Sequence, residues 1–266
     1  MTVVEDRERP SFEDLLQILT QLDSWLDRLD PEGPRSGVAA ESDLGRDDQI
    51  ADPFQLSFAA RHSLSYAVDH LHMLRSTLRD AGVIHMYAPY SLVRGAMENG
   101  SAAVWMLAPD SQPKRLMRRL RLATLDIANG ERVKDLIGVT GPRTLNERRD
   151  RVRQVARAAG LDPKEALRHV SYSEIVTAAG SHTSIGEKQA RLVWNMCSGV
   201  AHGDFWSTIS VTDNVELPGA PEGIAHLHVT ADVRKLALVT FFAAQMVQQA
   251  WRLFAQRSEP VAQSPA

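Results

Sequence analysis

The sequence predicts an all-α protein, an antiparallel helical bundle with a small two-stranded β-hairpin before the last long helix. Apolar residues recur three or four positions apart along most of the chain, as they do on one face of a helix. Pro and Gly stand where these periodic stretches begin and end. Strand-like alternation is confined to the region of residues 207–232.

Residues 1–53 are predicted to form an N-terminal helix followed by a long loop. Ser11 can cap the helix after Pro10, and the helical spacing continues to Leu29. The apolar positions of this helix are Leu15, Ile18, Leu19, Leu22, Leu26 and Leu29. Residues 30–53 are rich in Pro, Gly, Ser and Asp, which is typical of a surface loop.

Residues 54–256 are predicted to form the helical-bundle domain, and residues 257–266 a disordered tail. Its helices are expected at residues 54–80, 89–107, 113–137 and 144–160, two short ones at 162–170 and 171–180, and one at 185–202. Ser184 and Glu187 have the spacing of a capping box, and Gly203 can end that helix. Residues 207–213 and 223–232 form the expected hairpin, and the last helix starts at Thr230 or Asp232.

Composition narrows the function classes. The net charge is −3 and the pI about 6.3, so nucleic acid could be bound by a local basic patch and not by the surface as a whole. The single cysteine, Cys197, excludes an intramolecular disulfide and fits a reducing cytoplasm. The N-terminus lacks an apolar signal core, and the longest apolar run, residues 236–247, is too short to span a membrane. We therefore expect a cytoplasmic protein without membrane contact.

No cofactor or metal site is predicted. The chain lacks a Gly-rich phosphate loop, a nucleophile elbow and a dinucleotide fingerprint. His70 and His72 are two residues apart on a predicted helix and point in different directions, so they cannot share an ion easily. His226 and His228 share one face of a predicted strand, but no third ligand is evident.

Four polar residues form a stripe on the helix that ends at Gly203. Arg191, Asn195, Ser198 and His202 are spaced by four, three and four residues, which places them within about 60° of one another on the helix. One interpretation is a buried hydrogen-bond network that sets the register of the bundle. The other is a catalytic site with His202 as acid or base, Arg191 on a phosphate, Asn195 orienting the substrate or His202, and Ser198 donating a hydrogen bond.

Arg94 and Glu98 offer a partner for this stripe. They lie four residues apart and can pair on one face of the helix that starts at Pro89. In the catalytic interpretation Glu98 orients His202. In the alternative, Arg94 and Glu98 are an ordinary ion pair within one helix.

The helix that starts at Pro113 carries a basic cluster, Arg115, Arg118, Arg119 and Arg121, and a second cluster follows at residues 148–153. Two basic helices can follow a phosphate backbone, so we predict these four arginines as RNA-binding residues. Interspersed acidic residues also fit a solvated face without a ligand.

The segments "RLVWNMCSGVAHG" and "SLVRGAMENGSAAVWML" resemble a bacterial group with a late Ser-x-x-x-His element and an earlier Arg-x-x-x-Glu element. That group is similar to the HEPN-type helical bundles of toxins, phage-defence proteins and RNA-processing enzymes. The resemblance implies metal-independent RNA cleavage centred on His202, a homodimer with a composite cleft, and a protein partner such as an antitoxin. Arg191 stands eleven residues before His202, a longer separation than the family motif has.

Two functions from different classes therefore follow. The first is RNA cleavage or related phosphate-transfer chemistry of the defence or toxin type. The second is a non-catalytic helical protein that binds a partner or a small ligand, in which the stripe of residues 191–202 is structural.

Overall fold

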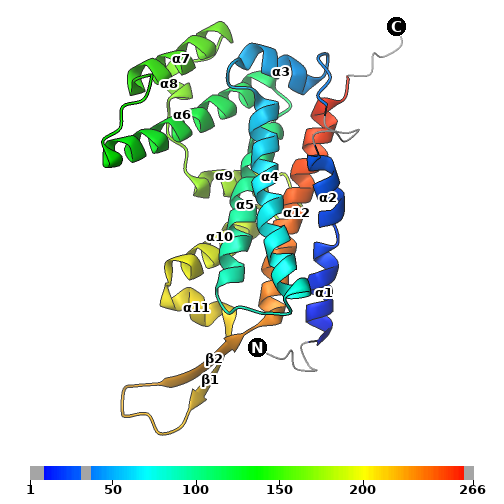
Figure 1. Ribbon diagram of the computed structural model, residues 1–266, viewed down its shortest axis with the longest axis vertical. Helices are drawn as coiled ribbons and strands as arrows, with labels where there is room; N and C mark the ends of the chain where they lie inside the picture. Colours follow the sequence, from blue (N-terminus) through cyan, green and yellow to red (C-terminus); the bar gives the residue numbers. More distant parts are fainter. Residues whose placement is uncertain (1–8, 31–36, 261–266) are drawn as a thin grey trace.

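Three long helices, two that run in the same direction and one that runs opposite to them, form the centre of the computed structural model, which describes residues 9–30 and 37–260. They are α4 (Leu56–Arg75), extended by the π-helical turn η1 (Ser76–Asp80), α5 (Ala88–Leu107) and α12 (Val233–Ser258). Figure 1 shows α5 lying beside both α4 and α12. The predicted all-α fold class, with one small hairpin before the last helix, is confirmed.

Small residues on α5 let its neighbours approach closely. A Cβ on Gly95 would collide with the ring of His70 on α4. A Cβ on Gly100 would lie 3.3 Å from the side chains of Met246 and Val247 on α12. The second half of α5 is buried on nearly all sides, which explains why its sequence is apolar around the whole helix.

The N-terminal region differs from the prediction. The predicted single helix is two, α1 (Arg9–Leu19) and α2 (Leu22–Leu29), separated by a turn at residues 20 and 21. Their apolar sides belong to the main core, where Trp25 also donates a hydrogen bond of 3.1 Å to Gln248 of α12. Both helices therefore pack on the bundle.

The predicted loop of residues 30–53 is wrong in its second half, where α3 (Asp43–Ala51) forms; residues 31–36 lie outside the described part. Ser42 caps α3 by accepting a hydrogen bond from the Gly45 amide at 3.0 Å. Leu44 is fully buried, but the helix is short and also buries Asp47, so its sequence carries little apolar periodicity. That is why composition suggested a loop.

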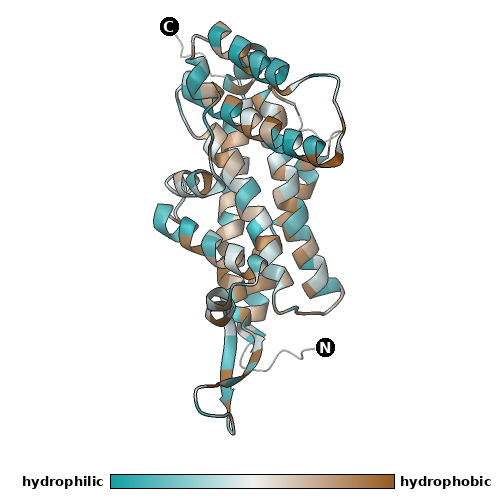
Figure 2. Ribbon diagram, turned by 90° about the vertical axis from the view of Figure 1, so that its left-hand side faces the viewer, coloured by the Kyte–Doolittle hydropathy of each residue, from teal (hydrophilic) through white to brown (hydrophobic). Residues whose placement is uncertain are grey.

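Three helices form an arm at one end of the bundle. They are α6 (Gln112–Ile137), α7 (Leu145–Ala158) and α8 (Pro163–Ala166). The arm has a small core of its own, made of Leu120, Ile127, Val152, Val155, Ala156 and Ala166. Figures 1 and 2 show this arm at the top, with hydrophilic residues prominent on its surface. Helix α7 begins with a complete capping box between Thr144 and Glu147.

The remaining elements are α9 (Tyr172–Gly180), α10 (Glu187–His202), α11 (Phe205–Val211) and the hairpin of β1 (Thr212–Leu217) and β2 (His226–Ala231). Gly203 ends α10 with a left-handed φ of 75°, as predicted. The predicted Ser184–Glu187 capping box is wrong, because α10 starts after Gly186 without a side-chain cap.

The hairpin is confirmed, but its first strand is displaced. Residues 205–211 are helical, and β1 pairs antiparallel with β2 from Thr212 opposite Ala231 to Leu217 opposite His226. Alternation at two positions, Ile209 and Val211, does not exclude a helix, which explains the error. Asp232 caps α12, accepting hydrogen bonds from the amides of residues 234 and 235 at 2.9 and 3.1 Å.

Helix α12 ends at Ser258, two residues later than predicted, so the predicted tail of residues 257–266 is wrong at its start. Arg257 is buried and contacts Asp43 of α3 and Asp110, each at 2.7 Å. Residues 261–266 lie outside the described part. Within residues 9–30 and 37–260, no helix combines the length and apolar character needed to cross a membrane.

Candidate functional site

The polar stripe of residues 191, 195, 198 and 202 lies on the outer side of α10. Arg191, Asn195 and His202 are exposed, and Ser198 is partly buried. None of the four side chains forms a hydrogen bond or ion pair with another residue in the described part of the chain. The structure therefore does not place them in a buried network, and their polar groups are available to solvent or a partner.

Glu98 is bound to residues other than His202. Its Oε1 accepts hydrogen bonds from Arg94 Nε at 2.8 Å and from Trp194 Nε1 at 2.9 Å. Trp194 precedes His202 by two helical turns, about 12 Å along the axis. Arg94 and Glu98 thus form an ion pair within α5 that also fixes α10, and the predicted contact between Glu98 and His202 is absent from the described structure.

The first arginine of the predicted basic cluster is part of the core. Arg115 is 2% exposed and contacts Asp47, which is 0% exposed, through Nε at 2.5 Å and Nη2 at 3.1 Å. Its Nη1 donates to the carbonyl oxygens of Pro109 and Asp110 at 3.1 and 2.8 Å. Arg115 therefore joins α6 to α3, and it presents no surface for RNA.

The other three arginines of the predicted basic cluster also make internal contacts. Arg118 donates to the carbonyl of Trp105 at 2.5 Å. The guanidinium groups of Arg118 and Arg121 both lie over the Trp105 ring, 5.1 and 5.8 Å from its centroid. Arg119 donates to the carbonyl of Gln55 at 3.1 Å and faces the ring of Phe54. Burial lowers the pKa of Arg119 to about 10, so it stays charged at neutral pH. Of the four, Arg119 lines the cleft described next.

A large cleft of about 1170 Å³ lies between the arm and the central bundle, lined by residues of α4, α5, α6 and α7 and by Tyr172 of α9. One wall is aromatic. Phe58, His62 and Tyr66 stand one turn apart on α4, and Phe58 and Tyr66 are 67% and 50% exposed. The His62 ring stacks with Phe58 at 5.9 Å and meets Tyr66 edge-on at 4.6 Å.

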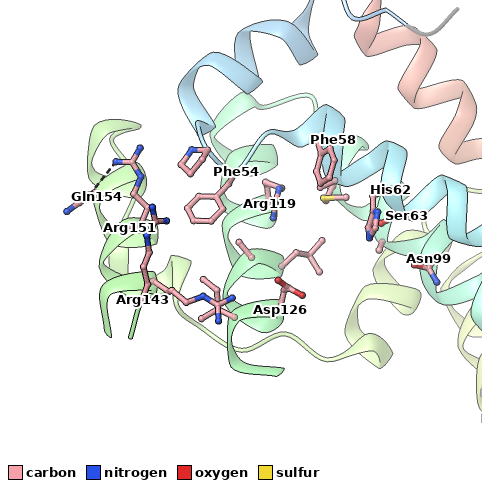
Figure 3. A pocket seen from close by; sticks show the side chains of 18 of the residues that line it. Phe54, Phe58, His62, Ser63, Asn99, Arg119, Asp126, Arg143, Arg151 and Gln154 are labelled. Carbon is pink, nitrogen blue, oxygen red and sulfur yellow. Dashed lines mark hydrogen bonds between the residues drawn. The ribbon is translucent and has the colours of Figure 1, made fainter. Parts of the chain in front are cut away.

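The opposite wall is basic. Arg143, Arg148 and Arg151 come from α7 and the residues before it. Figure 3 shows Arg143 and Arg151 across the cleft from Phe58 and His62, with Arg119 between the walls. Arg143 forms no hydrogen bond or ion pair within the described residues. Arg148 lies 3.6 Å from Glu131, and Arg151 contacts Gln154 at 3.5 Å, so both are weakly held. We call the whole site the aromatic–arginine cleft.

Three acidic residues also line this cleft: Asp126, Glu147 and Asp150. Glu147 is occupied by the Thr144 cap, which lowers its pKa through the backbone and hydroxyl hydrogen bonds. Asp150 pairs with Arg153 at 2.5 Å. Asp126 is exposed, and its carboxylate has no hydrogen bond or ion pair with the described residues, so one carboxylate of the cleft remains available to a ligand.

Sequence reasoning missed this cleft, although parts of its signal are visible. Phe58, His62 and Tyr66 repeat every fourth residue, and the basic cluster of residues 148–153 was recognised. What joins them is the fold-back of α7 onto α6, which places residues more than 80 positions apart on facing walls. No sequence periodicity encodes that juxtaposition.

Other chemistries find less support in the geometry. Within the described ranges, no three His, Cys, Asp or Glu side chains gather to hold a metal ion. Cys197 is fully buried, and burial raises the pKa of its thiol to about 12, so it is unsuited to nucleophilic attack. A comparison of the chain with protein-family models, curated proteins and solved structures found no match.

Proposed function

We propose that this protein is a helical ligand-binding protein whose site is the aromatic–arginine cleft, and that the ligand carries both a flat ring and a negative charge. The observation behind this proposal is the pairing of the two walls, with exposed rings on α4 and weakly held guanidinium groups on the α7 side. Exposed aromatic rings are costly to leave in water, and a stacked ligand ring covers them.

The charges of the cleft favour an anion. Four arginines and three carboxylates line it, but Glu147 and Asp150 are held by Thr144 and Arg153. Arg143 is exposed and Arg151 has a single long contact, so an anionic group can take up their donors without breaking a strong pair. The volume of about 1170 Å³ exceeds the roughly 300–1,000 Å³ of typical small-molecule sites, so a ligand need not fill the whole cleft.

A fluorescent probe with fused rings and a sulfonate, 8-anilinonaphthalene-1-sulfonate, tests this proposal on the full chain. We expect saturable binding that weakens about tenfold in Phe58→Leu and in Arg143→Ala, because each variant removes one wall's contact. Phe241→Leu and Arg252→Ala are the matched controls, since both residues are exposed on α12, outside the cleft. Equal binding by all four variants would place the probe elsewhere and contradict the proposal.

A second candidate is metal-independent RNA cleavage centred on His202. It is favoured by the exposure of Arg191, Asn195 and His202 without internal partners. Arg191 lies about 16 Å from His202 along α10, so one chain does not bring them together. We propose a homodimer for this activity, in which a second copy covers the exposed Leu192, Phe205 and Trp206 and supplies the missing groups.

The His202→Ala variant separates this second candidate from a structural role. His202 is exposed at the helix end, so the variant should lose RNA cleavage while its melting temperature stays within about 1 °C. Light scattering should give twice the chain mass of 29.4 kDa. A parent protein that is monomeric at micromolar concentration and leaves RNA intact would end this candidate and leave the ligand-binding proposal standing.

A further inference from the structure

We infer that the ligand of the aromatic–arginine cleft is a free nucleoside phosphate whose base carries an exocyclic amino group. The inference rests on the proposed binding function and adds the chemical class of the ligand. Three features of the cleft support it. Phe58, His62 and Tyr66 form a row of aromatic rings long enough for a nucleobase, the guanidinium groups lie on one side, and two hydrogen-bond acceptors have no donor of the protein.

The base fits the aromatic wall. Phe58, His62 and Tyr66 extend over two helical turns, about 12 Å along α4. The exposed rings of Phe58 and His62 are nearly parallel, at 13°, and the Tyr66 ring is turned by 61° relative to His62, so a purine or pyrimidine can stack on one of these ring faces. Base–aromatic stacking tolerates any base. His62 is fixed between its neighbours by ring contacts at 5.9 and 4.6 Å, so the platform is ordered before a ligand arrives.

The phosphates fit the opposite side. The loosely held guanidinium groups of Arg143, Arg148 and Arg151 lie together on the α7 wall, and planar guanidinium groups bind phosphate oxygens in pairs. Arg119, between the walls, is already bound to the Gln55 carbonyl and adds fixed positive charge. This one-sided charge matches a nucleotide, whose phosphates all lie on one side of the base.

A free nucleotide fits better than a nucleic-acid strand. A strand needs a basic path that continues past the stacking platform. The neighbouring arginines of α6 do not provide one, because Arg115 is buried on Asp47 and Arg118 and Arg121 donate to main-chain carbonyls. The net charge of −3 also opposes attraction of a polyanion.

Hydrogen-bond acceptors near the aromatic rings of α4 determine which base the cleft prefers. Asn99 donates its amide NH₂ to the Gly95 carbonyl at 2.9 Å, which leaves its side-chain oxygen as an acceptor. Asp126 offers two unpaired carboxylate oxygens. Acceptors bind the exocyclic amino groups of adenine, cytosine or guanine, whereas uracil has no amino group and presents its single N3–H between two carbonyl oxygens, which other acceptors repel. The cleft should therefore discriminate against uridine nucleotides.

Isothermal titration calorimetry of the full chain tests the inference with ATP, UTP, adenosine, tripolyphosphate and a ten-residue oligoadenylate. We expect ATP to bind at least tenfold more tightly than UTP, adenosine or tripolyphosphate, because only ATP uses both walls and the acceptors. Phe58→Leu and Arg143→Ala should each weaken ATP binding about tenfold. Asp126→Asn should reduce the preference for ATP over UTP, and Asp69→Asn, an exposed position on α4 outside the cleft, should change nothing.

The outcomes separate the inference from the proposed function. If the sulfonate probe binds through Phe58 and Arg143 but no nucleotide binds, the cleft is a ligand site and the nucleotide inference is wrong. If neither the sulfonate probe nor a nucleotide binds, the proposed function and the nucleotide inference are both wrong. Tighter binding of the oligoadenylate than of ATP overturns the free nucleotide in favour of a strand, and equal affinities for ATP and UTP overturn the selection by Asp126 and Asn99.

Discussion

Asp47 and Arg115 should be the most sensitive polar pair of this protein. Asp47 lies on α3, in the region predicted as a loop, and accepts hydrogen bonds from Arg115 and, at 2.9 Å, from Gln112 Nε2. Both charged side chains are almost completely buried, at 0% and 2% exposure. Their contacts attach α3 to the first turn of α6, and so also hold the arm on the bundle.

Replacing Asp47 by Asn keeps the shape of the side chain but removes its charge and one acceptor oxygen. The guanidinium group of Arg115 is then buried without the carboxylate that it contacts directly, which costs about 3–5 kcal/mol. Unfolding entropies of about 2.1 cal/mol/K per residue amount to about 0.6 kcal/mol/K for a chain of this length. The melting temperature of Asp47→Asn should therefore fall by about 5–9 °C, measured by circular dichroism or calorimetry.

Two further variants make this prediction specific. Asp80→Asn changes the same functional group in the exposed pair with Arg79 at 2.8 Å, and its melting temperature should not change measurably. The double variant Asp47→Leu with Arg115→Met should be more stable than Asp47→Asn, because it leaves no buried charge. A fall of less than 2 °C in Asp47→Asn, or a double variant that is less stable than it, would refute the reasoning.

Three other predictions concern the helices around the core. Gly199→Ala should destabilise the fold by about 1–3 kcal/mol in urea unfolding although Ala favours helix, because a Cβ there would lie 2.7 Å from Ser207 Cβ; a stabilised variant would contradict this packing. Cys197 should resist alkylation at pH 8 in the native protein and react after denaturation, since burial raises its pKa to about 12; rapid native labelling would show that α10 opens. Partial burial alone would raise the pKa of Asp43, but hydrogen bonds from Arg257 and Arg46 lower this pKa below its usual value of 3.8. The charged carboxylate therefore stabilises the fold at pH values above 3.8, and this stabilisation is lost as the pH falls through the lowered pKa. The stability difference between the parent and Asp43→Asn should thus shrink as the pH falls from 6 to 3, and a constant difference would contradict the sign.

The helices that the sequence predicts well are those with a long apolar face and clear ends. Pro89 and Pro113 stand in the first turns of α5 and α6, and Gly203 ends α10, because these residues act through their own backbone geometry. Predictions failed where the neighbours decide the conformation. Helix α3 depends on the buried Asp47–Arg115 pair, and α11 packs against α10 at Gly199.

In the candidate site, too, the sequence predicts which residues share a helix face but not which residues that face contacts. The sequence identified Arg191, Asn195, Ser198 and His202 as one stripe, and the structure places them on α10, with three of the four exposed. It also identified an Arg94–Glu98 pair, which forms at 2.8 Å. It could not show that Glu98 also accepts from Trp194, because helical spacing determines which residues share a face and not what that face meets.

The sequence by itself therefore determined the class of the fold, most helix ends and the residues that lie together on each helix, since these follow from backbone geometry over a few turns. The tertiary structure decided which arginines are free. It buries Arg115 against Asp47 and leaves Arg143 facing the rings of Phe58 and His62. The availability of a charged side chain depends on distant partners, because a buried charge is stable only when another part of the chain supplies its counter-charge.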